Sequence, residues 1–139
     1  MICTVKKFPG VAFFLFIALL LSSCSSDKQE IHQILDARDQ AVSMHDLAAY
    51  KSLLHSDYQH LGQNASDVLA RVKQLFSQFE TMEMRSSDRS IYFVDDSHAQ
   101  CEQSYILRVK ADSQWRAIAQ RERIDLTRSA DGWKISGGL

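Results

Sequence analysis

Proline is nearly absent from this chain, and cysteine is scarce. Of 139 residues, one is proline and three are cysteine. Cys3 and Cys24 lie close to the N-terminus, so Cys101 has no partner for a disulfide within a folded domain, and a cysteine-rich metal site is excluded. We expect Cys101 to be a small buried apolar residue. The hydrophobic core must then hold the fold together without a covalent crosslink.

Neither sign of charge dominates. The chain has 16 lysine and arginine residues against 17 aspartate and glutamate residues, which gives a formal net charge of −1. A protein that binds nucleic acid through the phosphate backbone needs a clustered basic surface, and the sequence contains no such cluster. Nucleic acid is therefore not an expected partner.

Motifs for metals, cofactors and activated nucleophiles are missing as well. The histidines are not spaced as a metal-binding pair on one helix. The chain has only five glycines, and they form neither a phosphate-binding loop nor a glycine-flanked serine elbow. We expect no metal and no cofactor. The histidines are His32, His45, His55, His60 and His98.

The N-terminal region contains one long apolar run, residues 11–21 (VAFFLFIALLL), which follows two lysines. A helix that spans a bilayer needs about 20 apolar residues, so this run has the length of a signal-peptide core instead. Directly after it stand Leu-Ser-Ser and Cys24, a sequence that resembles the bacterial lipobox. The alternative is an ordinary secretory signal in which Cys24 has no role.

The lipobox resemblance implies how the precursor is divided. Residues 1–23 are a lipoprotein signal peptide, and residues 24–139 are one domain with a short tether to about residue 27. Cys24 is then expected to carry a diacylglyceryl group and an amide-linked acyl chain such as palmitate, and two or more chains give stable membrane binding. In such lipoproteins an aspartate after the cysteine favours the inner membrane. Ser25 therefore favours the outer membrane, facing the periplasm, if the cell is Gram-negative.

Three helices are expected in the first half of the domain. Ser26 is the predicted N-cap of the first, whose apolar stripe at helical spacing also includes Arg38. Asp46 is the predicted cap of the second, and Asn64 or Ser66 that of the third. The expected elements are a helix from Ser26 to near His45, a short helix at 47–54, a short strand at 55–61, and a third helix that begins at one of its two candidate caps and reaches Phe79.

The second half of the chain changes to the alternation that is typical of strands. Segments rich in isoleucine, tyrosine, phenylalanine and valine are separated by turn sequences such as Asp-Asp-Ser and Ala-Asp-Gly. Three helices followed by an antiparallel meander predict an α+β domain, with the helices on one side of the sheet. The expected strands are at residues 83–94, 98–110, 115–128 and from 133 onward.

The order of elements is similar to that of the nuclear transport factor 2-like (SnoaL-like) superfamily. The segment DLAAYKSLL from Asp46, the strand at Tyr58 and residues 123–135 (RIDLTRSADGWKI) carry this resemblance, which covers residues 27–135. It implies a cone-shaped, curved, largely antiparallel sheet wrapped by three N-terminal helices around a pocket. Proteins with this fold include isomerases, dehydratases, hydrolases and plain binding modules, so the fold alone does not define an activity.

Side chains that point into such a cone would form the site. The resemblance implies that Asp125 is a candidate acid or base, with Tyr58 or His60 as the hydrogen-bond donor. The alternative is that residues 121–125 form a solvated strand face with cross-strand ion pairs. The candidate ligand-binding residues are Tyr58, His60, Tyr92, Gln103, Tyr105, Arg121 and Arg123.

Two classes of function fit these observations. The first is a lipid-anchored envelope protein whose cone binds a small apolar ligand, or docks another envelope protein or a second copy of itself. The second is a small-molecule enzyme that uses acid–base chemistry in the cone. The first is favoured because no pair of carboxylates with distinct environments is apparent, so the protein is not expected to be an enzyme.

Overall fold

The computed structural model describes the backbone of residues 11–139 and the side chains of residues 25–139. The first helix, α1, spans Val11–Ser43 and continues through Ser26, so Ser26 does not cap it, and the expected tether lies within the helix. The reason is that residues 11–43 contain no proline or glycine to interrupt the helix. The side chains of residues 1–24 lie outside the described part of the chain, so the signal peptide and the lipidation of Cys24 stay predictions.

The next elements are short and begin at polar caps. Helix α2 (Leu47–Ser52) begins as predicted at Asp46, whose side chain accepts from the Ala49 N–H at 2.9 Å. The predicted strand at 55–61 is reduced to β1 (Gln59–His60), which pairs with β2 (Gln63–Asn64).

Helix α3 (Ala65–Gln78) shows which of its two predicted caps is used. Asn64 and Asp67 exchange hydrogen bonds at 3.1 and 2.9 Å in a capping box, whereas Ser66 lies within the first turn. Asn64 therefore supplies the cap.

The second half of the chain is the predicted meander. Strands β3 (Thr81–Phe93), β4 (His98–Ala111), β5 (Gln114–Ser129) and β6 (Gly132–Gly137) form one antiparallel sheet in the order β3-β4-β5-β6. The Ala-Asp-Gly sequence makes the β5–β6 turn, where Gly132 has a φ of 100° that favours glycine.

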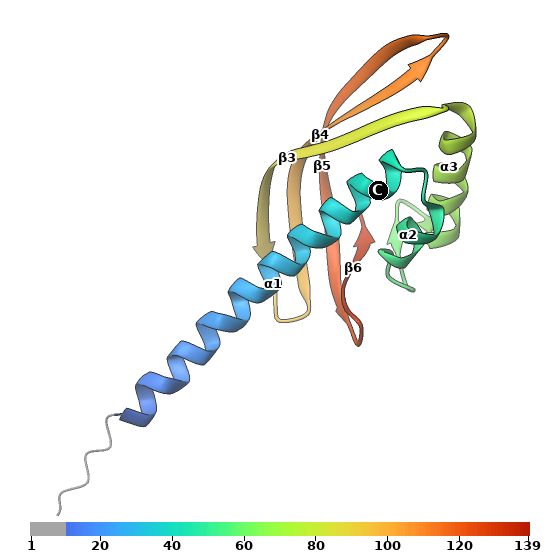
Figure 1. The fold of residues 1–139 in the computed structure, drawn as a ribbon. Helices are drawn as coiled ribbons and strands as arrows, with labels where there is room; N and C mark the ends of the chain where they lie inside the picture. The colour runs from blue at the N-terminus through green and yellow to red at the C-terminus, as the bar shows by residue number, and fades with distance from the viewer. Residues whose placement is uncertain (1–10) are drawn as a thin grey trace, which may run out of the picture.

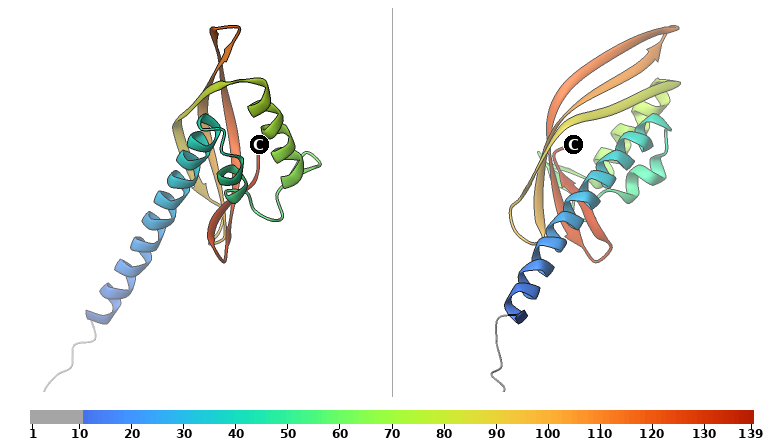
Figure 2. Two further views of the ribbon diagram at one scale, coloured as in Figure 1. Left: turned by 45° about the vertical axis from the view of Figure 1, so that its right-hand side comes forward. Right: turned by 60° about the vertical axis from the view of Figure 1, so that its left-hand side comes forward.

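The sheet is strongly curved, and the helices cover its concave face (Figures 1 and 2). One irregularity lies between Ser87 and Ser90 in β3. Another lies in the β5–β6 pairing, where Asp125 pairs with Gly137 and Leu126 with Ile135, so that β6 has one extra residue. Bulges of this kind bend a strand and increase its twist. The end of the β4–β5 hairpin extends beyond the helices, opposite to the end at which α1 begins (Figure 2).

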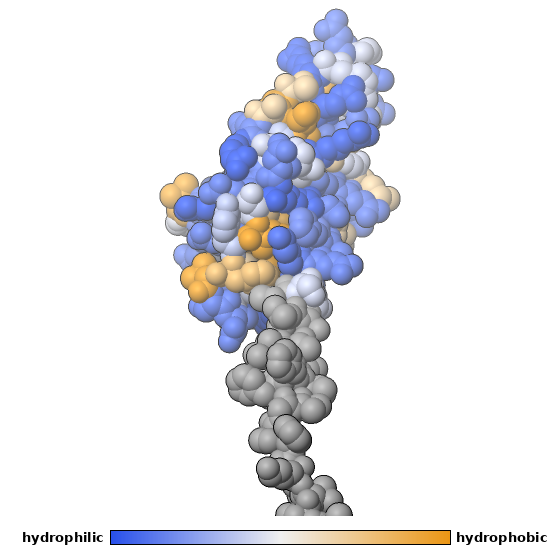
Figure 3. Space-filling view, turned by 90° about the vertical axis from the view of Figure 1, so that its left-hand side faces the viewer, coloured by the Kyte–Doolittle hydropathy of each residue, from blue (hydrophilic) through white to orange (hydrophobic). Residues whose placement is uncertain are grey.

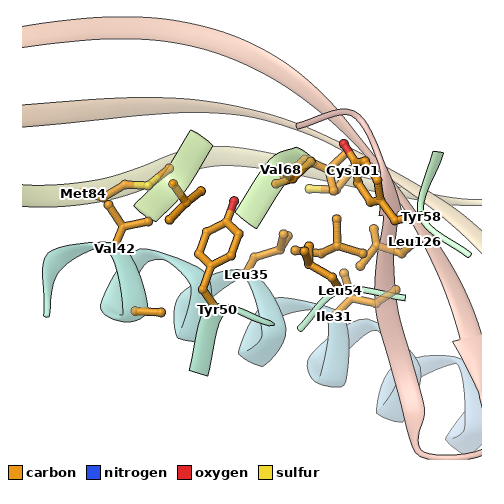
Figure 4. Close-up of a cluster of buried hydrophobic side chains, with 14 of the residues drawn as sticks. Ile31, Leu35, Val42, Tyr50, Leu54, Tyr58, Val68, Met84, Cys101 and Leu126 are labelled. Carbon is orange, nitrogen blue, oxygen red and sulfur yellow. The ribbon is translucent and has the colours of Figure 1, made fainter. Parts of the chain in front are cut away.

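The core lies between α1, α2, α3 and the sheet (Figure 4). Cys101 is fully buried there, as predicted, and Trp133 packs edge-on against Phe93 with ring centroids 5.9 Å apart. The helical contribution comes from Ile31, Leu35, Ala41, Val42, Tyr50, Val68 and Val72.

The α+β class and the cone-shaped antiparallel sheet are thus confirmed. Within the described part of the chain, no helix has an apolar stretch long enough to cross a membrane. The surface seen in Figure 3 is mostly hydrophilic and carries small separate apolar patches.

Candidate functional site

A cavity of about 390 Å³ lies between the concave face of the sheet and the helices. It is bounded by residues of α1, α2, α3 and β3 to β5, and by Gly138 and Leu139. A volume of this size falls within the range of about 300–1,000 Å³ that is usual for small-molecule sites. Its apolar wall consists of Val42, Val72, Leu75, Met84 and Leu107. Its polar side chains are Arg38, Tyr50, Arg71, Tyr105, Gln120 and Glu122.

An ion pair between Arg38 of α1 and Glu122 of β5 forms part of the cavity wall. Arg38 Nη1 donates to Glu122 Oε1 at 2.6 Å, and Arg38 Nη2 donates to Oε2 at 3.2 Å. The two side chains are 8% and 12% exposed. Burial alone lowers the pKa of Arg38, but nearby Tyr50 and Glu122 more than offset this effect and raise it overall. Arg38 therefore stays charged and links α1 to the sheet.

Gln103 of β4 also hydrogen-bonds to the Glu122 carboxylate. It is 0% exposed, and its Nε2 donates to Glu122 Oε1 at 2.8 Å and to Ser86 Oγ at 3.2 Å. Its Oε1 accepts from Arg89 Nε at 2.8 Å. Glu122 thus accepts three hydrogen bonds within the protein, and its lone pairs are largely occupied.

The network continues along α1 to Asp39. The Asp39 carboxylate accepts from Ser86 Oγ at 2.8 Å and from the Ser86 backbone N–H at 2.7 Å. Arg89, which lies in the β3 irregularity, approaches Asp39 at 3.7 Å and pairs with Asp36 at 2.6 Å. This set of buried polar groups fixes the position of α1 over the concave face, and therefore fixes the shape of the cavity.

Tyr105 combines an apolar ring with a polar tip at the cavity. Its hydroxyl donates to Gln120 Oε1 at 2.8 Å, and the Arg38 guanidinium lies 6.0 Å from its ring centroid. Burial, and secondarily Glu122, raise the pKa of Tyr105. Its phenol is therefore protonated at neutral pH and acts as a hydrogen-bond donor.

Arg71 of α3 brings a positive charge to the rim of the cavity. It is exposed, and its Nη1 donates to Gln63 Oε1 at 2.7 Å. Because Gln63 is neutral, this contact does not cancel the charge. A ligand with an anionic or hydrogen-bond-accepting end is favoured here.

Of the residues predicted for the site, Gln103 and Tyr105 are at or beside the cavity. Tyr58 is 1% exposed, but its hydroxyl is bound to the backbone of Leu139, with distances of 3.0 Å to the carbonyl oxygen and 2.8 Å to the N–H. Burial raises the pKa of Tyr58. His60 lies in the small β1–β2 hairpin and does not line the cavity.

The other predicted residues lie on the outer face of the sheet. Arg121, Arg123 and Asp125 alternate with buried Ile124 and therefore point away from the helices. Asp125 accepts from Gln100 Nε2 at 3.0 Å. Tyr92, which pairs with Gln100 in the register, is on the same outer face and is 56% exposed. Arg121, Arg123 and Asp125 thus lie on the outer face with cross-strand contacts, whereas Glu122 and Ile124, which alternate with them, point inward.

Glu122 and the role of Arg38 were not predicted, although the sequence contains a signal for each. Side chains alternate between the two faces of a strand. Ile118, Ile124 and Leu126 are an even number of residues from Glu122, so Glu122 lies on the apolar face of β5 and points inward. Arg38 lies on the apolar stripe of α1, and a charged residue in that position needs a buried partner.

No metal site is apparent in the structure over residues 25–139, because no three histidine, cysteine, aspartate or glutamate side chains are grouped to hold an ion. Cys101 is also unsuited to nucleophilic chemistry, since burial raises the pKa of its thiol to about 11.

The chain has the NTF2-like fold. A protein of the NTF2-like superfamily from Salmonella enterica serovar Typhimurium superposes with a TM-score of 0.73 and 17% identity, over 83% of this chain and 89% of that one. A candidate dehydratase of the same family from Streptomyces avermitilis gives a TM-score of 0.70 and 14% identity, over 82% and 94%.

A candidate scytalone dehydratase from Novosphingobium aromaticivorans is also similar. It superposes with a TM-score of 0.74 and 10% identity, over 85% of each chain. Neither the family models nor the curated proteins include a match to this sequence. The comparisons therefore establish the fold, while the site must be interpreted from its own geometry.

Proposed function

We propose that this protein is a lipid-anchored binding protein of the bacterial envelope, whose cavity holds a small ligand with an apolar body and one polar end. The anchor rests on the lipobox-like sequence that ends at Cys24. The cavity of about 390 Å³ with a wall of aliphatic side chains is the observation that carries the binding function.

The polar groups of the cavity support binding more than catalysis. Glu122 is the carboxylate that lines it, and this carboxylate already accepts hydrogen bonds from Arg38 and Gln103. A general base needs a free lone pair within reach of the proton that it removes. Arg71 and the apolar wall, in contrast, remain available to a ligand's polar end and body.

A fluorescent probe tests this proposal directly. 1-Anilinonaphthalene-8-sulfonate combines an apolar ring system with one anionic group, and we expect it to bind in the cavity. Leu107 lines the cavity, whereas Ile106 is on the opposite face of the same strand. Leu107→Trp should fill the cavity and weaken binding about tenfold or more, while Ile106→Trp should leave the affinity unchanged.

Equal affinities for the two variants, with both still folded by circular dichroism, would place the probe elsewhere and contradict the proposal. Native mass spectrometry of the protein from its own cells supplies the second measurement. A bound small molecule that the Leu107→Trp variant no longer retains would identify the natural class of ligand.

An enzyme is the second candidate, and one observation favours it. Glu122 is a carboxylate only 12% exposed, and it lies beside Tyr105 in a cavity of ligand size. This arrangement provides an acid or base next to a phenol donor. The co-purified molecule distinguishes the two functions. Incubation with the protein should leave it chemically unchanged if the site only binds it, and should yield a product if the site is catalytic.

A further inference from the structure

Strand β5 has a long edge that no strand covers. Strand β6 pairs with β5 only over residues 125–129, so in the described structure residues 114–122 have β4 on one side and no strand on the other. The side chains of residues 114–121 are all exposed, including those that point to the concave side. The hairpin that carries this edge projects beyond the helices (Figures 1 and 2).

The edge has defined limits. At one end the chain turns at Asp112 and Ser113, which have φ values of 50° and 63°. At the other end Gly138 packs against the strand, and a Cβ atom on Gly138 would overlap the carbonyl oxygen of Arg123. The free edge therefore extends over residues 114–122, and its midpoint is Ile118.

The middle of this edge lacks the usual protection against pairing. Proteins shield edge strands with prolines, charges or covering elements, because unpaired N–H and C=O groups attract another strand. The midpoint here is Ala117, Ile118 and Ala119, without a charge or a proline. Ile118 is 49% exposed, and nearby Trp115 is 41% exposed.

We propose that two copies of this chain pair antiparallel through β5, with Ile118 on the two-fold axis. In this register Ala117 faces Ala119 of the second copy, and Arg116 faces Gln120. Trp115 faces Arg121, which permits a cation–π contact. The edge is thus complementary to itself, as an isologous two-fold interface requires.

Charge excludes the registers centred on Arg116 and on Arg121. A two-fold axis at Arg116 or Arg121 would place two arginines directly opposite each other, and like charges at opposed positions destabilise a pair of strands. An axis closer to Arg123 would place the second copy where Gly138 already lies. The register centred on Ile118 uses the whole free edge and avoids both conflicts.

The pairing has a consequence for the cavity. The two-fold axis is perpendicular to the joined sheet, so both concave faces and both α1 helices lie on the same side. Gln120 lines the cavity, and in this register Arg116 of the second copy is its neighbour. The second copy therefore adds a positive charge beside the cavity rim, where Arg71 already supplies one.

Crosslinking in membranes tests the proposal on the full chain. In Ile118→Cys, the two new thiols face each other across the axis at a separation that a disulfide can bridge. Ile106→Cys is the matched control, because Ile106 is an isoleucine of almost equal exposure, 48%, in the middle of the outer sheet face. Mild oxidation should crosslink Ile118→Cys to a dimer at least tenfold more than Ile106→Cys or the parent chain.

Sedimentation in detergent provides the second measurement. The parent chain and Ile106→Asp should be dimers, and Ile118→Asp should be a monomer with unchanged circular dichroism. A parent chain that is monomeric at about 100 μM would overturn the proposal. So would equal crosslinking of both cysteine variants, a dimer abolished by Ile106→Asp instead, or crosslinking of Ile118→Cys to a different protein only.

Discussion

At the scale of single residues, the Arg38–Glu122 pair is the most consequential feature of the site. It joins α1 to β5 at the cavity, and the two side chains are only 8% and 12% exposed, so water replaces a lost partner only in part. A buried ion pair adds little stability compared with a well-packed apolar pair, but removing one partner leaves an uncompensated charge. The pair therefore serves to hold α1 in one position over the sheet more than to raise the total stability.

Glu122→Gln tests this role, because it removes the charge and keeps the shape. We expect the free energy of unfolding to fall by about 3 kcal/mol or more, since Arg38 is left without its counterion. Glu83→Gln is the control: Glu83 pairs with Arg108 at 2.8 Å, but those side chains are 39% and 45% exposed. That change should cost less than about 1 kcal/mol.

Urea denaturation monitored by circular dichroism measures both variants. Adding Arg38→Met to Glu122→Gln should restore most of the lost stability, because no unpaired charge is then buried. If Glu122→Gln and Glu83→Gln cost the same, the Arg38–Glu122 pair would be equivalent to a surface contact and would not define the position of α1.

At the scale of elements, helix α3 depends on its N-terminal cap. The helix supplies Arg71, Val72 and Leu75 to the cavity, so its start determines where this wall lies. Asn64 and Asp67 satisfy each other's backbone N–H groups at that start. The sequence offered two candidate caps, and the backbone of Asn64 has the extended conformation that a cap adopts.

Asn64→Ala should lower the free energy of unfolding by about 1 kcal/mol and Tm by about 4 °C, because a backbone donor loses its partner. Ser66→Ala is the matched control, since Ser66 is exposed within the first turn. Its effect should stay within about 0.5 kcal/mol. Thermal unfolding followed by circular dichroism compares them. A larger loss for Ser66→Ala than for Asn64→Ala would assign the cap to Ser66.

The helices and strands were predictable because the periodicity of their apolar residues is strong. Which residues of β5 face the core was not predicted correctly. Arg121, Arg123 and Asp125 were expected inside the cone, yet they face outward. A strand has only two faces, so a shift of one residue exchanges them completely. The correct parity follows from Ile124 and Leu126, which must face the core. In β5 the apolar residues are no more numerous than the charged ones, so the alternation of apolar residues is a weak signal there.

The helix cap predicted at Ser26 was wrong for a different reason. A capping pattern is local, whereas the continuation of α1 depends on whatever precedes the cap. In the uncut chain the preceding residues continue the helix. After cleavage before Cys24 they would be gone, and the first turn of the mature helix would have to find new partners for its backbone N–H groups.

At the scale of the whole molecule, the N-terminal contacts of the domain and the free edge of β5 lie at opposite ends. Glu30 of α1 contacts the β5–β6 turn through the Trp133 N–H at 2.9 Å, and Asp27 pairs with Arg128. The N-terminal side of the domain is therefore fixed to one end of the sheet. The free edge of β5 is at the other end. If Cys24 is lipidated as proposed, the residues between Cys24 and Asp27 are too few to let the domain reorient far from the membrane.

The proposed lipid anchor at Cys24 leads to the last prediction. Protein extracted from membranes should begin at Cys24 and carry the added mass of a diacylglyceryl group and an acyl chain. Cys24→Ser should abolish the added mass, because the thioether needs the cysteine sulfur. Cys3→Ser is the matched control and should leave the mature protein unchanged, because Cys3 is in the predicted leader.

Intact-mass spectrometry of the membrane fraction makes this measurement, and Ser25→Asp extends it. If the cell is Gram-negative, that variant should move from the outer to the inner membrane in a sucrose gradient. An unmodified mature protein that begins after a different residue would favour the ordinary secretory signal. The domain would then be released, the short connection to the bilayer would no longer orient it, and the cavity would serve a ligand in solution.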